Sequence, residues 1–198
     1  MNHDDYVRTD TIDDATSSFE LAADFLMMAK RDDRYWKWFV ISLHAGLQGT
    51  FALALDGGNG YLVQKPKVMS EMLLAHEKSA KHPLPHMDNF LKLYGKIQQQ
   101  SNLRWISSVP WSTSQTHDEA VESLDSLRDD FIHFNTKSWS IEKRLIIERA
   151  AAALEVAEFL VFESFSIFFY ESSQEIRVRT ALGRLRHELS GNKSKCNE

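Results

Sequence analysis

The segment that most constrains the fold is residues 34–55, which are apolar on nearly every face of the helix that their spacing predicts. A helix that is apolar all round has to be buried, so this segment predicts the central helix of a bundle. Gly46 and Gly49 would let a neighbouring helix approach closely, at some cost in helix propensity. The sequence DGGNG at 56–60 then ends the helix, because it is rich in turn-forming residues. The apolar residues include Trp36, Trp38, Phe39, Val40, Ile41, Leu43, Leu47, Phe51 and Leu53.

Three further segments show the three- and four-residue spacing of apolar side chains that is typical of amphipathic helices. The first begins near Asp13 or Asp14 and runs to about residue 31, the second spans 117–135, and the third is a long helix over 141–170. A last segment, 173–189, is expected to be helical as well. We find no strand pattern and no internal repeat. The sequence therefore predicts an all-α fold, a helical bundle of about four main helices.

The length of 198 residues fits one domain. We expect a flexible N-terminus over 1–12, a single helical domain over 13–190 and a flexible tail over 191–198. Residues 57–115 are the least regular part and read as an insertion of short helices and loops. Within it, we expect a short helix from Pro66 to Leu74, an extended connector at 81–86, a second short helix over 87–98 and a loop over 101–115.

Composition restricts the class of protein. A hydrophobic content of 43% excludes a disordered chain, and a net charge of −5 argues against a protein that coats nucleic acid through a global basic field. The single Cys196 allows no intrachain disulfide, which fits a reducing cytoplasm. The acidic, polar N-terminus is unlike a signal peptide. The apolar stretch 154–170 is interrupted by three glutamates, so we expect no membrane span and a cytoplasmic location.

Several kinds of site are excluded by spacing. The sequence lacks His-Glu-x-x-His, both glycine-rich phosphate-binding patterns and any Glu followed three residues later by a His. His76, His82 and His86 lie close in sequence, but we interpret them as surface histidines because no rigid frame holds them. We therefore expect neither a metal nor a cofactor. His44, on the central helix, is interpreted as a hydrogen-bonded core or interface histidine.

The segment 117–141 combines an amphipathic helix with two side chains that do not suit its apolar face. Arg128 lies beside this face, and His133 follows it five residues later. A cation or an imidazole next to a packing surface is costly unless it is paired. We expect Thr116 or Asp118 to cap the helix. The apolar face consists of Val121, Leu124, Leu127, Phe131 and Phe134.

The sequence LRDDFIHF at 127–134 resembles the motif of the HEPN superfamily, in which an Arg and a polar residue are followed by a His, with four to six residues between the Arg and the His. Arg128, Asp129 and His133 match these positions, although Asp129 departs from the Asn that is most typical of the family. The resemblance covers about 14–56 and 117–170. It implies an all-helical bundle, a homodimer in which two copies of the motif meet, and, in active members, a metal-independent ribonuclease.

Residue chemistry suggests how such a site would work. His133 could act as general base or acid in cleavage of RNA by its own 2′-hydroxyl, and Arg128 could clamp the phosphate. Asp129 could orient Arg128 or could weaken RNA binding. On a straight helix Arg128 and His133 lie about 140° apart, so they converge only if the helix ends near residue 135 or if a dimer joins them. The alternative is that Arg128 pairs with Asp125 or Asp129 while His133 packs under Trp139.

The last segment, 173–189, is the only clearly basic element. We expect Arg184 and Arg186, together with Trp111 or Trp105, to hold single-stranded RNA by charge and stacking. The alternative is a solvated face of a packed terminal helix. The leading hypothesis is a metal-independent endoribonuclease in stress or phage defence, with an antitoxin-like protein partner. The alternatives are a non-catalytic helical module that binds a protein, a nucleotide or RNA, and a purely structural dimer.

Overall fold

The computed structural model describes residues 7, 9–103, 107–133 and 140–193. Within these residues the chain forms seven α-helices and no strand, and its one β-bridge joins Gln64 to Met87. The prediction of an all-α fold is confirmed. Phe134 and Trp139, which entered the predictions for the helix at 117–135 and for the packing of His133, lie outside the described residues, as do Trp105 and Cys196.

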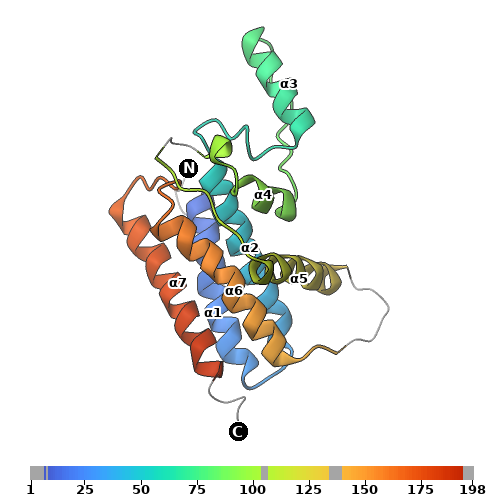
Figure 1. The fold of residues 1–198 in the computed structure, drawn as a ribbon, viewed down its shortest axis with the longest axis vertical. Coiled ribbons are helices and arrows are strands. Elements are labelled where there is room, and N and C mark those ends of the chain that lie inside the picture. Colours follow the sequence, from blue (N-terminus) through green and yellow to red (C-terminus); the bar gives the residue numbers. More distant parts are fainter. Residues whose placement is uncertain (1–6, 8, 104–106, 134–139, 194–198) are drawn as a thin grey trace.

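Helix α2 (Tyr35–Leu55) lies at the centre of the bundle, as its composition predicts. Helix α1 (Thr11–Ala29) packs along it, and α5 (Gln115–Ile132) and α6 (Lys143–Phe162) contact it from other sides. Helix α7 (Ser172–Lys193) packs on α1 and α6, at the outer edge of the bundle in Figure 1. The bundle therefore contains five long helices, because the basic last segment is a full member of it.

Close packing joins α1 to α2. Phe19 of α1 is fully buried, and a Cβ atom added at Gly46 would lie 2.7 Å from its ring. A Cβ atom at Gly49 would lie 2.7 Å from the Cβ atom of Ala15. The two glycines thus allow the close approach that the sequence predicts, and the neighbouring helix is α1 of the same chain.

Helix α2 is also long and apolar enough to cross a membrane when only length and composition are considered, and no other helix of the described residues meets this criterion. In the structure, 67% of its apolar stretch is buried inside the bundle. The core of a helical protein requires the same composition, so the property is weak support for a membrane span.

The N-terminal caps differ from the predicted ones. Helix α1 begins at Thr11 rather than near Asp13, because the carboxylate of Asp10 accepts a hydrogen bond from the backbone N–H of Asp13 at 2.8 Å. Helix α5 is capped by Ser114 rather than by Thr116 or Asp118. The carboxylate of Asp118 instead accepts hydrogen bonds from side chains outside the helix. Sequence alone shows several residues that can cap, and tertiary contacts decide which one does.

Helix α6 ends at Phe162, so the prediction of a helix to about residue 170 is wrong. Phe165 has a φ of 55°, which a continuous α-helix does not allow. The hydroxyl of Ser164 donates to Leu160 O at 2.8 Å, and it accepts the backbone N–H of Ser166 at 3.2 Å. These serine bonds compete with the helical pattern and stabilise the turn.

The segment 57–115 contributes one helix to the core of the bundle. Helix α4 (Phe90–Lys96) packs against α2 and α5, and its Phe90 and Leu93 belong to the hydrophobic core. Helix α3 (Pro66–Glu77) begins at the predicted proline and projects away from the bundle in Figure 1. A short 3₁₀ helix follows at Gln100–Asn102.

The packing of α1 on α2 predicts opposite effects for two glycine substitutions. Gly46→Ala would force the new methyl group against the Phe19 ring, so we expect a loss of about 1–3 kcal/mol in the free energy of unfolding. Gly183→Ala, in α7 with open space around it, should stabilise the protein by up to about 1 kcal/mol. Urea unfolding of both variants measures the difference. Equal stability of the two variants would contradict the close packing.

Candidate functional site

Arg128 lies near the C-terminal end of α5, and three side chains surround its guanidinium group. Nη2 donates to Asp125 Oδ1 at 3.0 Å, and Nη1 lies 2.6 Å from Asp129 Oδ1. Nη2 also lies 3.1 Å from Nε2 of His44, which comes from α2. The Arg128 side chain is 25% exposed, so it is held from the buried side and still reaches solvent. Both carboxylates considered in the alternative interpretation, Asp125 and Asp129, pair with Arg128.

His44 is the buried member of this cluster, with a side chain that is 3% exposed. Its Nε2 lies 2.9 Å from Asp125 Oδ1, and its ring packs on Phe90 of α4 at a centroid distance of 4.0 Å. Burial lowers the pKa of His44. The hydrogen bond to Asp125 opposes this shift, and the charge of Arg128 adds to it. The prediction of a hydrogen-bonded core histidine is confirmed, but its contact with Arg128 was not anticipated.

His133 is exposed and forms the C-cap of α5. Its backbone N–H donates to the carbonyl oxygen of Asp129 at 3.0 Å. Among the residues that the structure describes, no hydrogen bond or ion pair joins the side chains of His133 and Arg128. Trp139, under which His133 was alternatively expected to pack, lies outside those residues. The structure thus brings Arg128 and Asp129 together and leaves His133 exposed at the same helix end.

A groove of about 630 Å³ lies between the beginnings of α2 and α6 and the end of α5, where it is lined by Phe131, three residues after Arg128. Aromatic side chains of Trp36, Trp38 and Phe131 line it, together with the cations Arg34, Lys37 and Lys143 and the carboxylate of Asp33. The Nζ atom of Lys37 lies 5.3 Å from the centre of the Trp38 ring. This groove was not predicted from the sequence. The alternation of basic and aromatic residues in RYWKW at 34–38 was the available signal.

The arginines predicted to hold RNA are paired with carboxylates on neighbouring helices. Arg184 Nη2 donates to Asp24 of α1 at 2.6 Å. Arg186 pairs with Glu158 of α6 and lies 3.6 Å from Glu155, and its hydrogen bond to Glu158 raises its pKa. These contacts compensate both charges, so the two arginines contribute to helix packing in this structure.

Trp111 is partly buried on the connection before α5. Its Nε1 donates to the hydroxyl of Tyr94 at 3.3 Å, and its ring packs against His117 at a centroid distance of 4.9 Å. His117 lies 3.0 Å from Glu155, which also contacts Arg186. Trp111 and Arg186 are therefore linked through two intermediate residues, whereas Arg184 pairs with α1.

The three histidines of the segment 76–86 do not converge. The ring centres of His76 and His82 are 6.4 Å apart, and neither forms an ion pair among the described residues. Within the same residues, no group of three or more His, Cys, Asp or Glu side chains is placed to hold a metal ion.

The burial of His44 predicts a pH dependence of stability. An unfolded histidine has a pKa of about 6.5, and the folded pKa is lower, so the unfolded chain binds more protons between the two values. The contribution of His44 to the free energy of unfolding is therefore complete above about pH 6.5, and it is lost as the pH falls from there toward the lower pKa of the folded state. We expect acidification to destabilise the wild type more than His44→Gln, with slopes that differ by up to about 1.4 kcal/mol per pH unit.

Urea unfolding at a series of pH values measures these slopes. His187→Gln, at an exposed position of α7, is the control and should follow the wild type. Identical pH profiles for His44→Gln and the wild type would show that His44 has the same pKa in both states.

No protein-family model matches this chain, and neither the curated proteins nor the solved structures contain a match to it. The likeness to the HEPN superfamily therefore rests on residues 127–134 and on the helices around them. The function has to be inferred from the geometry of the site.

Proposed function

We propose that this chain is a HEPN-like, metal-independent endoribonuclease that acts as a homodimer in the cytoplasm. Arg128 binds the phosphate at the scissile bond, and His133 transfers protons. The observation that supports this most directly is one partly exposed guanidinium, held on its buried side by His44 and Asp125. It lies on the same helix as Phe131, which lines a groove with aromatic and basic side chains.

The contacts of Arg128 suggest how it could bind a phosphate. Asp125 and His44 lie on its buried side, with exposed fractions of 20% and 3% for their side chains. Asp129 is 50% exposed and can move away. A phosphate that replaces Asp129 would meet an arginine fixed in position, and the planar guanidinium can donate two parallel hydrogen bonds to it.

The groove between α2, α5 and α6 would bind the nucleobases and the RNA backbone, for which Arg128 alone offers no surface. Trp38 is half exposed, so a nucleobase can stack on its ring. Of its lining cations, Arg34 pairs with Asp32 and Lys143 pairs with Asp33. These two cations are 89% and 55% exposed, more than Arg184 and Arg186, so the RNA backbone could replace their carboxylates. The volume of about 630 Å³ is in the range of small-ligand sites. This groove replaces Arg184, Arg186 and Trp111 as the proposed RNA-binding surface.

The proposed reaction uses the 2′-hydroxyl of the RNA as nucleophile. The imidazole of His133 accepts the proton of this hydroxyl as its oxygen attacks the phosphorus, and a protonated imidazole returns a proton to the 5′-oxygen that leaves. Arg128 stabilises the negative charge that builds on the phosphate oxygens. The products are a 2′,3′-cyclic phosphate and a 5′-hydroxyl end. In a homodimer, the second imidazole could come from the other copy of the motif.

One observation favours a second candidate, a non-catalytic helical module that binds a protein, a nucleotide or RNA. Asp125 and Asp129 both pair with Arg128, so the cluster has no net positive charge in this structure. In this case Arg128 would serve only to fix α5 against α2.

The first experiment is cleavage of a mixed single-stranded RNA in EDTA. We expect the wild type to cleave, and His133→Ala and Arg128→Ala each to reduce the rate by about 100-fold or more, because they remove the proton-transfer group and the phosphate ligand. His187→Ala is the matched control and should keep full activity. Circular dichroism shows whether each variant is folded. A folded wild type without activity would favour the binding module, and activity retained in both site variants would refute the proposed site.

Asp129→Asn provides a test in the opposite direction. Removing the charge while keeping the shape should free Arg128 for a phosphate, so we expect a lower KM for RNA and a cleavage rate that rises severalfold. Glu122→Gln, at an exposed position of the same helix, changes the net charge equally and should leave both values unchanged. If both variants bind RNA like the wild type, Asp129 does not compete with a phosphate.

A further inference from the structure

Residues 65–86, here called the arm, leave the bundle as α3 and an extended return segment (Figure 1). Helix α3 has at most marginal contact with the other helices. On the arm itself, Met72 and Ala75 of α3 are buried. The arm is therefore a separate projection, and the bundle does not require it for its core.

The base of the arm is fixed by several hydrogen bonds. The backbone N–H of Lys65 donates to His86 O at 3.0 Å, and that of Asp88 donates to Val63 O at 2.9 Å. Lys96 of α4 donates to two carbonyl oxygens at the base and lies 2.9 Å from Asp88. These bonds hold the two chain segments together where the arm begins, so its direction away from the bundle is defined.

The arm presents apolar and basic groups to solvent. Leu84 is 87% exposed, and Leu73 and Leu74 of α3 are also exposed. The arm has four lysines (Lys65, Lys67, Lys78 and Lys81) and two glutamates, so it is positive in a chain with a net charge of −5. Exposed apolar side chains rimmed by charges mark an interaction surface, and its partner should be apolar and acidic.

The face of α1 and α2 has a groove with these properties. It consists of three adjoining hollows of about 540, 420 and 210 Å³, which share lining residues such as Thr11, Ala52 and Asp56. We call them together the α1–α2 groove. Asp10, Asp14 and Asp56 supply its charged groups, and none of its described lining residues is Lys, Arg or His.

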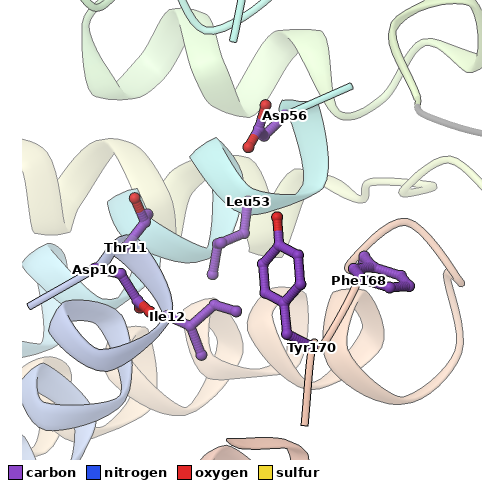
Figure 2. Close-up of a pocket in the computed structure, with 7 residues that line it drawn as sticks. All are labelled: Asp10, Thr11, Ile12, Leu53, Asp56, Phe168 and Tyr170. Carbon is purple, nitrogen blue, oxygen red and sulfur yellow. The ribbon is translucent and has the colours of Figure 1, made fainter. Parts of the chain in front are cut away.

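The shape of the α1–α2 groove suits a helix. Ala45 lines it with a small, exposed side chain that lets another backbone approach, and Leu21 adds an exposed apolar group. At the other end, Figure 2 shows the ring of Tyr170 between Phe168 and the side chains of α1 and α2, with its hydroxyl directed toward the end of α2. Helices commonly bind to partners by placing apolar side chains in such grooves.

We propose that the α1–α2 groove receives the arm of a second copy of this chain. Leu73, Leu74 and Leu84 would fill the groove, and the lysines of the arm would pair with its carboxylates. In its own chain the arm begins beside this groove, which Gln64 and Met87 help to line, and projects away from the bundle (Figure 1). A two-fold axis would let each copy place its arm in the groove of the other, so both contacts form at once.

Sedimentation of the full chain tests this proposal. We expect the wild type to form a dimer that high salt weakens. The arm variant Leu73→Glu/Leu74→Glu and the groove variant Leu21→Lys/Ala45→Lys should each weaken dimerisation by about 30-fold or more. Mixing the two variants should restore part of the association, because the mixed pair has one contact in which both the arm and the groove are intact, whereas either variant alone has none.

Ile176→Glu, at an exposed position of α7, is the control and should dimerise like the wild type. Circular dichroism excludes unfolding of the variants. A wild type that stays monomeric at all accessible concentrations would overturn the proposal and leave the arm for a different partner. A dimer that survives both pairs of substitutions, or variants that fail to complement each other, would overturn it as well. RNA cleavage is measured separately, so failure of this proposal and failure of the ribonuclease proposal are distinguishable.

Discussion

The close contact of α1 with α2 is the interaction on which the rest of the structure depends. Gly46 and Gly49 let Phe19 and Ala15 pack directly on the backbone of α2. This contact buries one face of α2 and leaves its other faces for α5, α6 and α4. Because α2 is apolar on most sides, it needs all of these neighbours, and their positions around it place His44 opposite α5. The candidate site is therefore a consequence of how the central helix is covered.

Helix α7 joins the bundle through charges as well as through apolar packing. Arg177 bonds to Glu20 and Asp13 of α1, and Arg186 bonds to Glu158 of α6. Each exposed pair contributes at most about 1 kcal/mol, but together the pairs fix the register of α7 on two helices. A basic segment in an acidic protein suggested a nucleic-acid surface. The structure instead places the complementary carboxylates on the neighbouring helices, where sequence spacing does not reveal them.

The helices could be predicted from the sequence because apolar spacing and glycine are local signals. The periodicity located α1, α2 and α5, and Gly46 and Gly49 indicated a close approach. The end of α6 could not be predicted, because the Ser164 and Ser166 hydrogen bonds outweigh an apolar run that looks helical. The candidate site could be predicted only in part. Asp125 and Asp129 lie near Arg128 in sequence, whereas His44 is 84 residues away and reaches it only through the packing of α2 on α5.

His44 links the core to the surface chemistry. Its Nε2 faces both Asp125 and Arg128, so its proton decides which of the two it can bond. When neutral with Nε2 unprotonated, it accepts from Arg128 and leaves Asp125 to the same guanidinium. When protonated, it donates to Asp125 and repels Arg128. Burial and the nearby cation both favour the neutral form. Burial therefore favours the uncharged imidazole, and when its Nε2 is unprotonated Arg128 can stay on α5 with the side bonded to Asp129 toward solvent.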